Sequence, residues 1–182
     1  MGIKKSLTKS WDNLCERTGF EFIKTPLRYA SDENEVTLAV PGYRQTKSYS
    51  CGYVAGLMVL HTFYPKKSVT NFYCAVNPHR DWGTSTTKLI KALRMSGVGI
   101  ARKTHVSFEE LKNAINQGFP ILTAIKRTRD IEHWVAIFGV GVEPNRIFLA
   151  GNSTVGGHVM TWPMFKKIWN TEREILVCWG AK

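Results

Sequence analysis

The sequence predicts an α+β fold in which a helical half packs on an antiparallel β-sheet. Helical patterns gather between residues 51 and 118, whereas strand-like patterns follow one another from 120 to 179. Helices and strands that are segregated along a chain are typical of this fold class. The chain has 182 residues, 43% of them hydrophobic, and no Gly/Ser-rich or Pro-rich linker. We therefore expect one domain, or one domain with an appendage.

The elements before residue 51 are short. A helix is predicted at 6–18 from its apolar stripe, which Gly19 ends. Residues 35–40 alternate between apolar and polar types like a strand, and Pro41-Gly42 ends it. Residues 43–50 are predicted to form a polar loop.

Five helices and six strands are predicted after this loop. The apolar segment 51–64 has the length of a helix and closes at Pro65. A capping box at Ser107 and Glu110 marks the start of another helix, because each of the two residues can satisfy a free N–H group of the other. The remaining predicted elements are helices at 68–76, after the cap at 83–85 and at 163–169, and strands at 98–103, 120–126, 133–142, 146–151, 157–161 and 174–179.

The chain is strongly basic, with 25 Lys and Arg against 14 Asp and Glu, which gives a net charge of +11. Residues 66–103 hold eight of the basic residues and a single acid, Asp81. Such an excess invites a nucleic-acid partner, but no arginine-rich tract or zinc-ligand spacing accompanies it. A solvated basic face is favoured, and a nucleic-acid partner is not expected.

The four cysteines contain no Cys-x-x-Cys pair, which argues against a zinc ribbon or a redox site. No secretory signal is visible, and the longest apolar stretch, 52–60, is too short to span a bilayer. We expect no transmembrane segment and a cytoplasmic protein, or one delivered without a visible signal peptide. Its thiols should be reduced, and Cys15, Cys74 and Cys178 are interpreted as structural residues.

The chemistry is expected at Cys51, which opens the apolar helix. There the helix dipole and the free N–H groups of the first turn favour the thiolate. Six residues earlier, the amide of Gln45 can donate to an oxyanion beside the Cys51 N–H group. Taken singly, however, Cys51 is better interpreted as a small buried residue, and Gln45 as a surface residue.

Two later residues complete a candidate set. His133 begins an apolar strand and can act as the general base for Cys51. Asn152 follows the next strand and, if the two strands are antiparallel, can accept from the imidazole and fix its orientation. Alone, His133 could be a strand-end histidine and Asn152 a turn residue. The ordered set of four is what favours a Cys-His-Asn site.

These segments resemble papain-like cysteine peptidases, in particular the bacteriocin-leader-processing (double-glycine) type. Residues 45–52, followed by 55–60, look like the active-site helix of that family, with the Gln six residues before the Cys. Residues 133–137 are similar to its His-bearing strand, and the resemblance extends over about 38–180. The family usually has Asp where this chain has Asn152, and Pro is common where it has Tyr53.

The resemblance implies a papain-like fold and a peptidase that cleaves a peptide or protein substrate without a metal or an organic cofactor. Cys51 would attack the peptide carbonyl, Gln45 would hold the oxyanion, His133 would protonate the leaving amine, and Asn152 would orient His133. It also implies an N-terminal extension of helix plus loop at 1–37 and a peptidase domain at 38–182. Two alternatives stay open: an acyltransferase that uses the same site, and a non-catalytic binding module that holds an acidic partner.

Four tryptophans, Trp82, Trp134, Trp162 and Trp169, are interpreted as core or cleft-wall residues rather than as a platform for stacking nucleotides.

Overall fold

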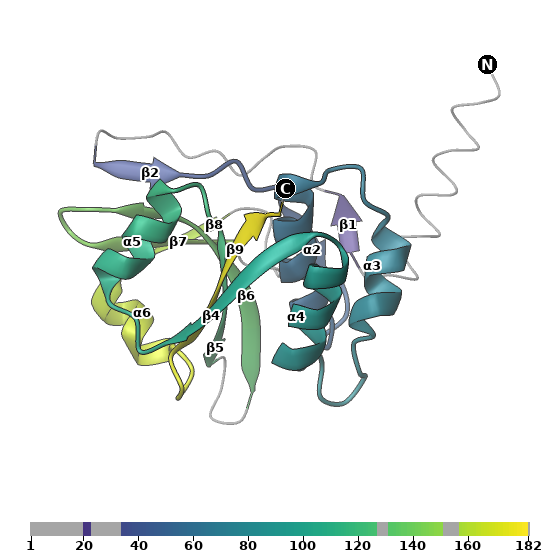
Figure 1. Ribbon diagram of the computed structural model, residues 1–182. Coiled ribbons are helices and arrows are strands. Elements are labelled where there is room, and N and C mark those ends of the chain that lie inside the picture. The colour runs from purple at the N-terminus through teal and green to yellow at the C-terminus, as the bar shows by residue number, and fades with distance from the viewer. Residues whose placement is uncertain (1–19, 23–33, 127–130, 151–156, 182) are drawn as a thin grey trace, which may run out of the picture.

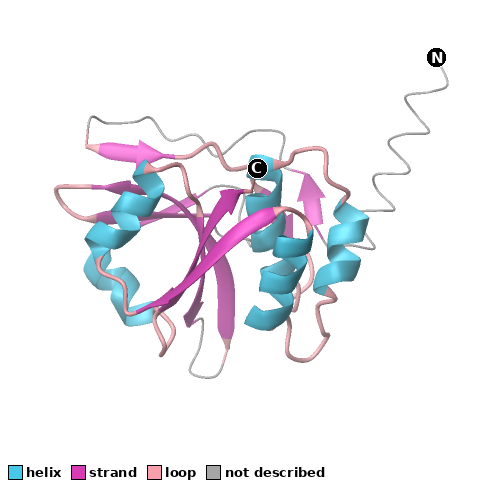
Figure 2. Cartoon of the chain, viewed as in Figure 1, coloured by secondary structure: helices cyan, strands magenta, loops and turns pink. Residues whose placement is uncertain are grey.

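A seven-stranded antiparallel sheet carries helices on both faces (Figure 1). This is a computed structural model, and it describes residues 20–22, 34–126, 131–150 and 157–181. Helices α2–α4 cover one face of the sheet, and α5 and α6 cover the other (Figure 2). The predicted α+β fold is confirmed.

The sheet is built around β6 (Glu132–Gly141), which pairs with three other strands. The strand order is β4 (Val98–Thr104), β9 (Glu174–Gly180), β5 (Ile121–Lys126), β6, β7 (Arg146–Ala150) and β8 (Gly157–Thr161). In the first half of β6, His133 lies opposite Ile125 of β5. In the second half, residues 139–141 pair with β2 (Glu35–Thr37).

The helix ends follow the local signals in the sequence. The helices are α2 (Cys51–Phe63), α3 (Val69–Val76), α4 (Thr86–Met95), α5 (Phe108–Asn116) and α6 (Trp162–Ile168). A Ser or Thr side chain accepts a first-turn N–H group in four of them, at Ser68, Ser85, Ser107 and Thr161. Both hydrogen bonds of the predicted capping box between Ser107 and Glu110 are present.

Helix α2 lies at the centre of the helical half, and residues 51–61 of it are all buried. A helix that is apolar on every side needs cover on every side, which α3, α4, β3 and the sheet provide. Two glycines one turn apart allow close approach. An ideal Cβ at Gly56 would lie 2.7 Å from Cδ1 of Leu89 on α4, so a larger residue there would push α4 away.

The opposite face of the sheet holds a second core, formed by α5, α6 and the residues of β6 that alternate with those facing α2. Leu111 and Ile115 of α5 and Phe165 of α6 pack there against Ile137 of β6. The central strands β5, β6, β7 and β9 are therefore largely buried on both sides, whereas edge strand β8 is not.

Two predictions about the N-terminal part were wrong. Residues 43–45, expected in a loop, form β3 (Tyr43–Gln45), which pairs with β1 (Phe20–Phe22), a strand that was not predicted. Strands of three residues are too short to show alternation, so only their pairing defines them. The strand expected at 35–40 ends at Thr37, because the Val40 N–H group turns back to donate to the Leu38 carbonyl. The helix predicted at 6–18 lies outside the described residues.

Among the described residues, none of the helices combines the length and the apolar character needed to cross a membrane.

Candidate active site

Cys51 is the first residue of α2 and is 7% exposed. Ser50 occupies the N-cap position but does not cap the helix through its side chain. Instead, its hydroxyl donates to the Lys47 carbonyl at 2.9 Å. None of the described first-turn residues of α2 is acidic. The positive end of the helix dipole therefore lies at Cys51, where it favours the thiolate.

Gln45 ends β3 and is half-buried. Its Nε2 group donates to the Lys47 carbonyl at 2.5 Å, which uses one of its two N–H bonds. Its Oε1 atom is buried and has no hydrogen-bond partner among the described residues. The unpaired Oε1 atom can only accept, so the part of this amide that can donate to a substrate oxygen is its second N–H bond.

A buried pair connects β3 to the far end of α2. The Tyr43 hydroxyl lies 2.5 Å from Nδ1 of His61, and Nε2 of His61 lies 3.0 Å from the Lys67 carbonyl. Since a carbonyl can only accept, Nε2 carries the proton and Nδ1 accepts from Tyr43. Burial lowers the pKa of His61 and raises the pKa of Tyr43. This neutral pair holds the strand that carries Gln45 against α2.

His133 is the second residue of β6 and is 9% exposed. Its neighbour Trp134 is fixed by a 3.1 Å hydrogen bond from the indole Nε1–H group to the Thr84 carbonyl. An ideal Cβ at Gly52 would lie 3.0 Å from Cδ1 of Trp134 and 2.6 Å from Cβ of Thr84. The first turn of α2 thus contacts the start of β6. The contacting residues, Gly52 and Trp134, directly follow Cys51 and His133 in the sequence.

Asn152 lies outside the described residues. The strand before it is described: β7 runs antiparallel to β6, and its last residue, Ala150, lies opposite Ala136. The antiparallel pairing that the sequence argument required is therefore present. The role of Asn152 remains a prediction.

The other described cysteines differ from Cys51. Cys178 is fully buried in β9, and burial raises the pKa of its thiol to about 12. Cys74 is exposed on α3. Cys15 lies outside the described residues. Neither Cys74 nor Cys178 begins a helix.

The sequence did not indicate the part that residues 79–84 play beside the site. Thr84 accepts from Trp134, and its own Oγ1 atom is buried without a partner among the described residues. Trp82, expected in the core or a cleft wall, is 76% exposed and stacks on His79 with ring centroids 3.7 Å apart. The core assignment of Trp82 was wrong because apolar character alone does not show whether a turn residue is covered. Trp134 and Trp169 are buried, as expected.

Two hollows formed by described residues adjoin the start of α2 or of β6. One, of about 540 Å³, is lined by Lys47, Ser48, Tyr49 and Arg80. Another, of about 370 Å³, includes Trp134 and the ion pairs of Arg102 with Glu172 and Glu174.

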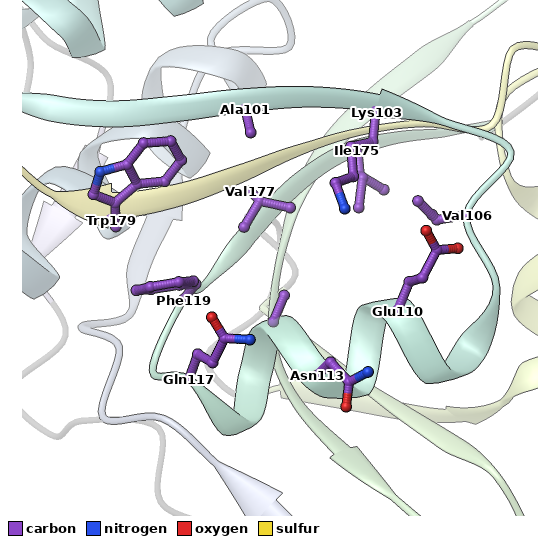
Figure 3. Close-up of a pocket in the computed structure, with 11 residues that line it drawn as sticks. Ala101, Lys103, Val106, Glu110, Asn113, Gln117, Phe119, Ile175, Val177 and Trp179 are labelled. Atoms are coloured by element: carbon purple, nitrogen blue, oxygen red, sulfur yellow. The ribbon is translucent and has the colours of Figure 1, made fainter.

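Another hollow, of about 290 Å³, is an apolar groove between α5 and strands β4 and β9 (Figure 3). It contains none of the candidate site residues. Within the described part of the chain, no group of three His, Cys, Asp or Glu side chains is placed to hold a metal ion.

The sequence profile of the Peptidase_C39 like family matches residues 37–175, more than half of the chain. The chain belongs to the Peptidase_C39 like family. No curated protein sequence matches it.

Solved structures of C39 peptidases share the fold. The peptidase domain of Streptococcus ComA, a bifunctional ABC transporter of a quorum-sensing pathway, superposes with a TM-score of 0.62 at 12% identity, over 81% of this chain and 98% of that one. A double glycine motif protease from an AMS/PCAT transporter, solved with its leader peptide, gives 0.64 at 17% identity over 80% and 95%. A C39-like peptidase from Bacillus anthracis gives 0.62 at 15% identity over 83% and 100%. At these identities the likeness concerns the fold.

Proposed function

We propose that this Peptidase_C39 like protein is a cysteine peptidase with Cys51 as nucleophile, His133 as general base, Asn152 as the residue that orients His133, and Gln45 as oxyanion donor. The observation that carries the proposal is the contact of Gly52 with Trp134 and Thr84. This contact brings the start of α2, which bears the Cys51 thiol, against the start of β6, which bears the His133 imidazole.

In the proposed reaction, the Cys51 thiolate attacks the carbonyl carbon of a peptide bond. The new C–S bond forms as the carbonyl π electrons move onto oxygen, which the Cys51 N–H group and the Gln45 amide stabilise. When the tetrahedral intermediate collapses, the C–N bond breaks and the His133 imidazolium protonates the leaving amine. Water then hydrolyses the thioester, which releases the carboxylic acid and regenerates the thiol.

A peptide is the substrate class to test first. The double glycine protease that shares this fold was solved with a leader peptide. The second N–H bond of the Gln45 amide, which the hydrogen bond to Lys47 leaves over, can donate to a peptide carbonyl. The proposal includes a peptidase domain at 38–182 and an N-terminal extension at 1–37.

The test measures cleavage of a proteome-derived peptide library and the rate of Cys51 alkylation. We expect wild type to cleave peptides, Cys51→Ala to abolish cleavage, and Cys74→Ala, a matched control at an exposed thiol, to leave it unchanged. Replacing Gln45 with alanine should lower kcat by about 10²–10³, as expected for loss of an oxyanion donor.

Other outcomes would decide for the alternatives. If added amines divert the acyl group from water quantitatively, the protein is an acyltransferase that uses the same thioester. If Cys51 alkylates no faster than an unfolded cysteine and no peptide is cleaved, the peptidase proposal fails. Strongly salt-dependent binding of an acidic partner would then favour a non-catalytic module.

A further inference from the structure

A hollow with two cationic side chains lies directly before the nucleophile helix. It has a volume of about 540 Å³ and is lined by Lys47, Ser48, Tyr49 and Arg80. The turn that carries the first three is fixed, because the Lys47 carbonyl accepts from the N–H group of Ser50 at 3.1 Å and from its hydroxyl at 2.9 Å. The same carbonyl accepts from Gln45. The hollow is therefore joined to the proposed oxyanion donor through one carbonyl group.

Arg80 reaches this hollow from a second fixed turn. His79 and Gly83 exchange two backbone hydrogen bonds, of 2.7 and 2.9 Å, across residues 80–82. Gly83 has a φ of +69°, and an ideal Cβ on it would lie 3.3 Å from the Tyr49 carbonyl oxygen. The turn thus packs against the segment that precedes Cys51. Its next residue, Thr84, is the one that accepts from Trp134.

The positive charge of the hollow is not neutralised within the described part of the chain. Neither Lys47 nor Arg80 has an ion pair with a described residue. Asp81, the single acid of residues 66–103, lies instead beside His79, whose Nδ1 atom accepts the Asp81 N–H group at 3.2 Å. The hollow next to Trp134 differs, because Arg102 there pairs with Glu172 and Glu174.

We propose that this hollow, lined by Lys47 and Arg80, is a substrate subsite that takes the carboxylate of an Asp or Glu side chain close to the scissile bond. The inference rests on the proposed peptidase function and adds a substrate class to it. An arginine fork matches a carboxylate in two parallel hydrogen bonds, and a lysine adds a point charge. Ser48 and Tyr49 line the same hollow, and the Tyr49 hydroxyl is hydrogen-bonded to Tyr73. Exposed Trp82, flat on His79, offers the peptide an apolar surface two residues from Arg80.

The experiment profiles cleavage sites of the full chain on a proteome-derived peptide library by mass spectrometry. Glu, Gln and Lys versions of one cleaved peptide then give kcat/KM ratios. We expect Asp and Glu to be enriched at one position near the cleaved bond, and the Glu peptide to be cleaved about tenfold faster than its Gln version. High salt should raise the KM of the Glu peptide and leave that of the Gln peptide unchanged.

Arg80→Glu and Lys47→Glu should each remove the preference for Glu over Gln, while the Gln peptide is still cleaved. Lys91→Glu is the matched control, because it changes the net charge equally on an exposed residue of α4 outside the hollow. Its Glu-to-Gln ratio should equal that of wild type.

The possible failures are distinguishable. Cleavage without an acidic preference, or an equal loss of preference in Lys91→Glu, overturns the subsite and leaves the peptidase proposal intact. If wild type cleaves no peptide and Cys51 shows no enhanced alkylation, the proposed function fails and the subsite fails with it.

Discussion

Replacing Gly52 with alanine should destabilise the protein and slow the proposed reaction. The added methyl group would meet Cβ of Thr84 at 2.6 Å and Cδ1 of Trp134 at 3.0 Å. Both residues are buried, and the indole hydrogen bond to the Thr84 carbonyl holds them together. Neither neighbour is the free end of a flexible chain. The backbone of α2 or of the Thr84 segment must therefore shift.

The size of the effect follows from the contact distances. The contact with Thr84 must open by about 0.8 Å to reach an ordinary 3.4 Å separation. Overpacking of this kind costs about 1–3 kcal/mol. The higher helix propensity of alanine offsets roughly 0.5–1 kcal/mol of it. We expect the free energy of unfolding to fall by roughly 0.5–2 kcal/mol, and kcat/KM to fall by up to about 10²-fold because a 1 Å shift misaligns reacting groups.

Urea unfolding and peptide cleavage measure the two effects separately. The matched control is Gly56→Ala, one turn along α2, whose methyl group would meet Cδ1 of Leu89 at 2.7 Å. That variant should lose stability, yet retain activity per folded molecule, because its methyl group would meet Leu89 and Phe72 rather than Trp134 and Thr84. If Gly52→Ala has wild-type stability and wild-type kcat/KM, the described junction between α2 and β6 is wrong.

Three further predictions concern other buried groups, Cys178, His61 and Trp134. The buried Cys178 thiol, with its pKa of about 12, should resist iodoacetamide in the native protein and react only after unfolding. Peptide mapping measures the labelling at each cysteine. Labelling of Cys178 as fast as that of exposed Cys74 would contradict its burial. Burial lowers the pKa of His61, so as pH falls the unfolded chain binds a proton there before the folded chain does. The free energy of unfolding should therefore decrease as pH falls below about 6.5. In urea titrations His61→Gln should lose this part of the pH dependence; the same pH dependence in the variant and in wild type would refute the prediction. Trp134→Phe deletes the 3.1 Å hydrogen bond and leaves the Thr84 carbonyl unpaired, so denaturant titration should show a loss of about 1–3 kcal/mol, whereas Trp82→Phe, at an exposed position, should change little.

Local signals in the sequence were sufficient for most of the helices and strands. The helix starts after Ser68, Ser85 and Ser107 are set by side chains that accept from N–H groups three positions away, so the local sequence contains both partners. Long strands such as β6 and β9 show as apolar runs. The six-residue spacing between Gln45 and Cys51, together with the His133 strand, was sufficient to indicate the family.

Only the tertiary structure determined which residues surround the candidate site. The contact between Trp134 and Thr84 joins residues 50 positions apart, and no local pattern encodes it. Strand β3, which ends at Gln45, exists because distant residues pair with it. Trp82 looked like a core residue and proved to be exposed, since hydrophobicity measures the gain from burial and not whether a neighbour is present.

The positive charge also shows the difference between what the sequence determines and what the tertiary structure determines. The sequence alone determined a net charge of +11 and its concentration in residues 66–103. It could not determine that Arg80 of that segment meets Lys47, from outside it, beside the start of α2. Net charge follows from the composition alone, whereas a binding site depends on the distances between its side chains. Two cationic side chains that are far apart in the sequence can act on one ligand only when the fold brings them close together, because electrostatic attraction weakens with distance.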